Sequence, residues 1–69
     1  MRNVNDINYE YEKGRIIEII NNTVNKEELY RYDCFYDIED NNIIFYIQEE
    51  NRLFKYCEVD INSEIISHF

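Results

Sequence analysis

Residues 32–47, YDCFYDIEDNNIIFYI, contain two strand-like segments separated by a short polar turn. Tyrosine, cysteine and isoleucine alternate with aspartate and phenylalanine before the turn, and an isoleucine-rich run follows it. A period of two places successive side chains on opposite faces of a sheet, and the intervening Glu-Asp-Asn-Asn has the composition of a turn. The sequence therefore predicts two antiparallel strands, at about 29–38 and 42–48.

Further segments of the same character extend this hairpin into a small sheet. They lie at about 8–12, 15–21 and 52–61. Gly14, the only glycine, can adopt the positive φ of a hairpin turn between the first two of them. We expect a mostly β fold, a five-strand antiparallel meander or a partly closed barrel, in one small domain over residues 1–69. The tail, residues 62–69, is expected to pack on the sheet as a short helix or turn, or to fray.

Residues 25–38 leave an alternative open. Asn25 could cap a helix, with Glu27 and Glu28 in its first turn. Against this, Asp33 would approach the negative end of the helix dipole, and tyrosine, phenylalanine, cysteine and aspartate are weak helix formers. If the helix forms, the fold is α+β, with one helix near 25–38 packed on a small antiparallel sheet.

The lengths of two turns decide which side chains share a face of the sheet. A loop of two or four residues near 40–41, followed by an odd-length loop at 49–51, keeps Glu58 and Asp60 out of the interior. The predicted core face then consists of Tyr32, Cys34, Tyr36, Ile38, Ile43, Phe45, Ile47, Leu53, Cys57, Val59 and Ile61. The two cysteines would lie roughly 10 Å apart, because one strand separates theirs, and this is too far for a disulfide.

The opposite face combines large apolar side chains with carboxylates. Its apolar positions are Phe35, Ile44, Tyr46, Phe54 and Tyr56, and its acidic rim consists of Asp33, Asp37, Glu58 and Asp60. A small sheet does not leave so large an apolar patch open without consequence. We expect the tail, a second copy of the chain or a partner to cover it, and we take these residues as the candidate partner-binding residues.

The chain is strongly acidic, with 15 Asp and Glu against 7 Lys and Arg and a formal net charge of −8. This charge disfavours nucleic acid or an anionic membrane as a direct ligand and favours a protein partner with a basic surface. The longest apolar run, residues 43–47, is too short to span a membrane, and no signal-peptide pattern begins the sequence. We therefore expect the protein in the cytoplasm of a bacterial host cell.

Residue types that support catalysis or cofactor binding are scarce. His68 is the only histidine, and one glycine cannot build a phosphate-binding loop. The two cysteines and the histidine are too few for a structural zinc site, and the acidic segment at 37–41 lacks the glycine of a calcium-binding EF-hand loop. We predict no catalytic, cofactor-binding or metal-binding residues, so the protein is not expected to be an enzyme.

Length, composition and charge together favour one function class. Isoleucine, asparagine and tyrosine are abundant while lysine is rare, as in an AT-rich genome with selection against positive charge. We expect an acidic protein-binding module that inhibits or regulates a nucleic-acid-interacting protein, of the phage anti-defence or host-takeover type, with nucleic-acid mimicry as one route. The alternative is a structural homodimeric subunit of a larger assembly, in which acidity only gives solubility.

Overall fold

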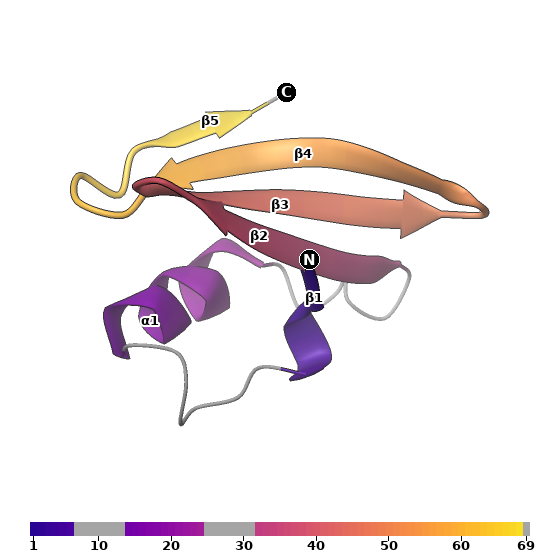
Figure 1. Cartoon of the computed structure of the whole chain (residues 1–69), viewed down its shortest axis with the longest axis horizontal. Helices are drawn as coiled ribbons and strands as arrows, with labels where there is room; N and C mark the ends of the chain where they lie inside the picture. The colour runs from indigo at the N-terminus through magenta and orange to yellow at the C-terminus, as the bar shows by residue number, and fades with distance from the viewer. Residues whose placement is uncertain (7–13, 25–31, 69) are drawn as a thin grey trace.

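The computed structural model describes residues 1–6, 14–24 and 32–68. These residues form a five-stranded antiparallel sheet with one α-helix and a short 3₁₀-helix on one side of it (Figure 1). The elements are β1 (Arg2–Asn3), η1 (Val4–Asp6), α1 (Gly14–Thr23), β2 (Asp33–Glu39), β3 (Asn42–Glu49), β4 (Arg52–Asp60) and β5 (Ile66–His68). The strands neighbour one another in chain order. The predicted mostly β antiparallel fold is confirmed, and the sheet is open rather than closed into a barrel.

The three central strands form where the alternation predicts them. β2, β3 and β4 occupy the segments predicted at 29–38, 42–48 and 52–61, except that residues 29–31 lie outside the described residues. Asp40 and Asn41 form a two-residue turn between β2 and β3, as the register argument requires. Asp40 has a φ of 53°, the left-handed conformation that aspartate tolerates better than most residues.

The predicted strand at 15–21 is wrong, because these residues belong to α1. Ile16, Ile19 and Ile20 follow the i, i+3, i+4 spacing of one helical face. Ile19 is 2% exposed and Ile20 is 0% exposed, while Glu18 points to solvent. An isoleucine-rich run of this length fits either a strand or a helix. Packing decides in favour of the helix, because a helix brings all three isoleucines against the sheet from one side.

The alternative helix near 25–38 is wrong from Asp33 onwards, because that residue begins β2. Residues 25–31 and the predicted strand at 8–12 lie outside the described residues. The described chain does combine a helix with a small sheet, as that alternative required, but the helix comes earlier in the sequence.

Two short strands that the sequence did not predict border the sheet. β1 pairs with β2, with Arg2 opposite Tyr36, and β5 pairs with β4, with Ser67 opposite Glu58. After β4 the chain forms a turn at 61–63 and then the edge strand β5, not a helix on the face of the sheet.

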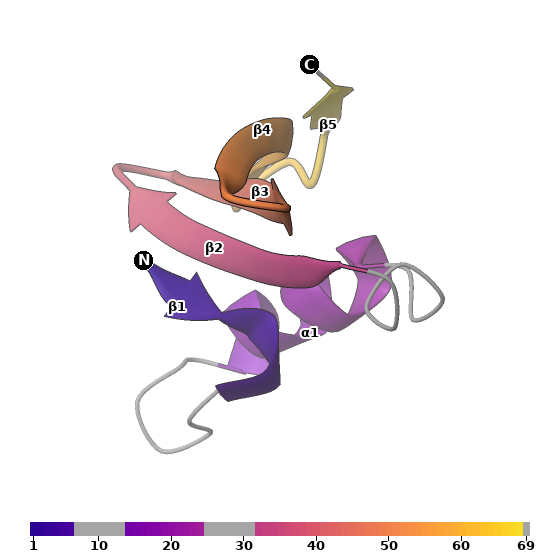
Figure 2. The ribbon, with the colours of Figure 1, turned by 90° about the vertical axis from the view of Figure 1, so that its right-hand side faces the viewer.

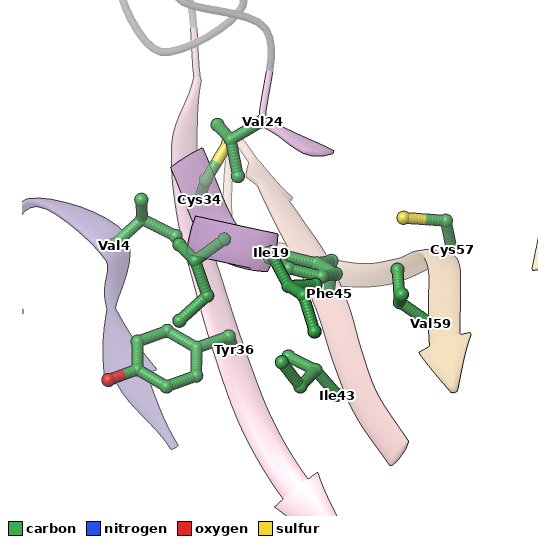
Figure 3. Close-up of a cluster of buried hydrophobic side chains, with 10 residues drawn as sticks. Val4, Ile19, Val24, Cys34, Tyr36, Ile43, Phe45, Cys57 and Val59 are labelled. Carbon is green, nitrogen blue, oxygen red and sulfur yellow. The ribbon is translucent and has the colours of Figure 1, made fainter. Parts of the chain in front are cut away.

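The hydrophobic core lies between α1 and one face of the sheet. Its buried members are Val4, Ile19, Ile20, Val24, Cys34, Tyr36, Ile43, Phe45, Cys57 and Val59. The close-up in Figure 3 shows Cys34 and Cys57 on either side of Phe45. Both cysteines are buried.

Candidate protein-binding face

A β-bulge in β4 determines which aromatic side chains face the helix. The turn between β3 and β4 contains two residues, Glu50 and Asn51, and not the odd number predicted. The extra residue lies within β4 instead. Phe45 is opposite Cys57 whereas its neighbour Tyr46 is opposite Lys55, so Tyr56 is the additional residue of the bulge.

The bulge places Tyr56 on the side of the sheet that α1 covers. Its hydroxyl donates a hydrogen bond to the carbonyl oxygen of Thr23 at 3.3 Å, and its ring meets that of Phe45 edge-on, with centroids 6.4 Å apart. Phe54 is opposite Ile47, a residue packed against the core, and so lies on the same side. The predicted placement of Phe54 and Tyr56 with the acidic residues is therefore wrong.

Leu53 also lies on the opposite face from the one predicted, because the extra residue is in the bulge and not in the turn. It is opposite Gln48 and lies on the face away from the helix, not on the core face where the alternation placed it. Between the turn and the bulge, the residues of β4 have the reverse orientation from the one that an odd-length turn would give them.

Three of the predicted apolar residues remain together on the face of the sheet away from α1, here called the outer face. They are Phe35, Ile44 and Tyr46, with Phe35 directly opposite Tyr46. Ile44, on the central strand, is only 4% exposed, and the side chains of Phe35 and Tyr46 are half-buried. Figure 2 shows α1 and η1 together on the opposite side of the sheet. Among the described elements, none lies over the outer face.

The four predicted carboxylates flank this apolar centre. Asp37 and Glu58 lie directly opposite Ile44, one on each neighbouring strand. Asp60 lies on the same face, two residues beyond Glu58 on β4. Asp33 lies on the same face, four residues before Asp37 on β2. Asp33 is exposed and the other three are half-buried. The structure therefore places Asp37 and Glu58 beside Ile44 and Asp60 next along β4, whereas Asp33 lies at the far end of β2, opposite Gln48.

Positive groups also reach the outer face. Lys55 is opposite Tyr46 and so shares its side of the sheet. The amino group of Met1 lies 3.7 Å from Oδ1 of Asp37. These groups reduce, but do not cancel, the negative charge of the face.

Asp60 has a structural role as well as a place on the rim. Its Oδ1 accepts hydrogen bonds from the backbone N–H groups of Asn62 and Ser63, each at 2.9 Å, and from the side-chain amide of Asn41 at 3.4 Å. The hydrogen bond from the Ser63 backbone is the largest influence lowering the pKa of Asp60; burial opposes it, and the Asn62 backbone adds to the lowering. Asp60 thus organises the turn that follows β4.

Arg15, a contact residue that sequence reasoning missed, joins the same turn to α1. Its Nε and Nη2 donate to the carbonyl oxygens of Ile61 at 2.8 Å and Asn62 at 2.9 Å. Its Nη2 also lies 3.9 Å from the carboxylate of Glu64. The contact joins segments far apart in the chain, and neither periodicity nor a motif carries a signal for it.

A shallow hollow of about 280 Å³ lies at one corner of the outer face. Its lining consists of Asn42, Glu58, Asp60, Ser63, Ile65 and Ser67. Four of these residues form two cross-strand pairs, Asn42 with Asp60 and Glu58 with Ser67. The hollow therefore lies where β3, β4 and β5 meet the turn after β4, and polar groups dominate its lining.

Within residues 1–6, 14–24 and 32–68, no group of three His, Cys, Asp or Glu could hold a metal ion. His68 is exposed on β5, opposite the buried Cys57. No helix in these ranges is long and apolar enough to cross a membrane.

The chain matches no protein-family model, no curated protein and no solved structure. Its function is therefore inferred from the geometry and charge of the outer face.

Proposed function

We propose that this chain is a non-enzymatic protein-binding module whose outer face docks on a basic surface of another protein. A nucleic-acid-interacting protein is the partner class that fits best, because its own binding surface is basic. By occupying that surface, the chain would inhibit or regulate its partner in the manner of a phage anti-defence or host-takeover inhibitor.

The composition of the outer face carries this proposal. Ile44 forms a buried apolar centre, and the half-buried rings of Phe35 and Tyr46 lie beside it. Aromatic residues around a desolvated centre are typical of the residues that dominate binding energy in interfaces. The surrounding carboxylates would steer a basic partner and fix its orientation. Apolar contact and charge are thus supplied by the same face.

The spacing of the carboxylates sets how far charge alone would let the face compete with nucleic acid for that basic surface. Glu58 and Asp60 are two residues apart on β4, which corresponds to roughly 7 Å. Asp37 and Glu58 are separated by two strand spacings, roughly 10 Å. A nucleic-acid strand carries one phosphate per about 3.4 Å of rise. The face therefore has about half that charge density along a strand, and apolar contacts must supply the rest of the affinity.

A homodimer through the same face is less favourable. In an isologous dimer each copy presents the same surface to the other. Asp33, Asp37 and Glu58 of both copies would converge, and like charges at an interface cost several kcal/mol. The outer face is therefore better matched to a different, basic protein.

A capture experiment with matched variants tests the proposal. The tagged chain is exposed to nuclease-treated lysate of an AT-rich bacterium, washed at low and high salt, and its bound proteins are identified by mass spectrometry. We expect one basic nucleic-acid-interacting protein, which added DNA or RNA displaces. Tyr46→Ala should weaken its capture, and the double reversal Asp33→Lys and Asp37→Lys should abolish it. Glu18→Lys, a reversal on the exposed side of α1, should leave capture intact.

The competing outcomes are distinct. Unchanged capture by both outer-face variants would contradict the proposal. Recovery of the chain alone, together with a melting temperature that rises with protein concentration, would support the homodimer instead. Matching thermal melts of the variants and the unmodified chain are the control against loss of binding through unfolding.

A further inference from the structure

We propose that the hollow at the corner of the outer face receives the guanidinium group of an arginine from the partner. The inference rests on the proposed function, since it specifies one chemical contact within that interface. Three observations support it: the Glu58 carboxylate has no partner among the described residues, the Asp60 carboxylate is held in place, and the hollow has a suitable size and lining.

Glu58 supplies the charge that a cation would meet. It lies on β4, between β3 and β5, and its side chain is half-buried. Among the described residues, none forms a hydrogen bond or an ion pair with its carboxylate. The Glu58 carboxylate is therefore available to a cation that enters the hollow, and the contact would be a charge-assisted hydrogen bond.

Asp60 supplies a second negative charge at a fixed position. The hydrogen bonds that its Oδ1 accepts from Asn62, Ser63 and Asn41 hold this carboxylate in place. A group that is already immobilised loses little further conformational entropy when it binds. Ser67, opposite Glu58, adds a hydroxyl that can accept a further hydrogen bond.

The size of the hollow favours a side chain over a small ion. Its volume of about 280 Å³ equals about nine water molecules at ~30 Å³ each, so a bare metal ion would leave it mostly filled with solvent. Arginine presents five donors on a planar, weakly hydrated group, whereas lysine presents one compact, strongly hydrated charge. The hydrogen-bond acceptors of the hollow, on Glu58, Asp60 and Ser67, are spread over its lining and therefore match the several donors of arginine better than the single charge of lysine. The exposed Ile65 can contact the methylene stem of the arginine.

Peptide titrations test this contact before the partner is known. The probes are three synthetic peptides in which glycine alternates with arginine, with lysine, or with citrulline, the neutral isostere of arginine. Each is titrated into the full chain at low salt and followed by backbone amide NMR shifts and calorimetry. We expect the arginine peptide to shift the amides of Glu58 and Ser67 and to bind more tightly than the lysine peptide. The citrulline peptide should leave these amides unmoved.

Two variants and a matched control localise the binding. Glu58→Gln should weaken the arginine peptide about tenfold, the value of one hydrogen-bonded charge. Ser67→Leu fills the hollow without changing the charge and should weaken it by at least as much. Glu18→Gln removes the same charge from α1 and should change the affinity by less than about twofold, because solvent and salt screen distant exposed charges.

Equal binding of the arginine and lysine peptides, or equal losses in the Glu58→Gln and Glu18→Gln variants, would overturn the inference. Such results would mean general attraction to an acidic chain. Capture of the natural partner separates the two proposals. Capture that needs Tyr46 but tolerates Glu58→Gln overturns the arginine contact and leaves the proposed function standing. Specific peptide binding at Glu58 without any basic partner in the lysate supports the contact and contradicts the proposed function.

Discussion

Replacing Arg15 with alanine measures how much the contact between α1 and the turn after β4 stabilises the fold. The change removes two hydrogen bonds from a charged donor, at 2.8 and 2.9 Å. Such bonds contribute about 1.5–3 kcal/mol each when shielded. The Arg15 side chain is 53% exposed, so we expect about 1–2 kcal/mol for the pair. Removing a cation from the first turn of a helix returns about 0.5 kcal/mol.

The net loss of about 1 kcal/mol should lower Tm by about 4–8 °C in a domain of this size. Thermal and urea unfolding followed by circular dichroism measure it. Arg15→Lys keeps the charge but lacks the planar guanidinium that donates to both carbonyl oxygens. The stability that this variant loses should therefore be intermediate. Hydrogen exchange adds a local readout. The N–H of Glu64, which donates to the carbonyl of Asp60 at 2.8 Å, should exchange faster in the Arg15→Ala variant.

Arg52→Ala is the matched control, because Arg52 is exposed at the start of β4 and none of the described residues accepts a hydrogen bond from it. We expect its stability to change by less than about 0.5 kcal/mol. Equal melting temperatures for the Arg15 and Arg52 variants would refute a stabilising role for the contact. Full retention of stability in Arg15→Lys would assign the effect to charge instead of to the two hydrogen bonds.

Three further changes probe the turns and the bulge. Glu50 has a φ of 57°, a conformation that costs a non-glycine residue about 1–2 kcal/mol. Glycine removes this cost but loses about 0.5–1 kcal/mol through the greater entropy of the unfolded chain. Glu50→Gly should therefore raise the midpoint of urea unfolding. The folded-state pKa of Asp60 lies below the value of 3.8 for the free group. Its charged form therefore contributes stability above about pH 4 that is lost as the pH falls through the lower folded pKa, and Asp60→Asn should remove that pH dependence from urea unfolding curves. Tyr56→Phe deletes the hydrogen bond to Thr23 and should cost about 1 kcal/mol, whereas Tyr46→Phe should leave Tm nearly unchanged.

The orientation of β4 shows what the sequence does and does not determine. Keeping Glu58 and Asp60 out of the interior requires one extra residue between β3 and Cys57. An odd-length turn and a bulge satisfy this requirement equally well, so Cys57 and Val59 are correctly predicted in the core. The position of the extra residue depends on Tyr56 reaching Thr23 and Phe45, which are contacts between distant segments. Leu53 and Phe54, which precede the bulge, are therefore misplaced by the alternation alone.

Other features could not be predicted for equally physical reasons. The isoleucines at 16, 19 and 20 fit both periods, and only the presence of an apolar sheet beside them selects the helix. β1 spans two residues and β5 spans three, which is too short for a periodic signal. The Arg15 contact and the hollow both depend on the turn after β4, whose geometry comes from the hydrogen bonds to Asp60.

The chain places two aromatic side chains, Phe35 and Tyr46, on the face of the sheet that the helix does not cover. A small domain has few large apolar groups, and an antiparallel sheet with one covered face ordinarily carries polar residues on the other. The bulge brings Tyr56 to the helix side, yet Phe35 and Tyr46 stay on the outer face with Ile44. Their exposure would promote self-association if the face were neutral. Under the proposed function, the surrounding carboxylates would oppose contact between two copies and favour a basic surface.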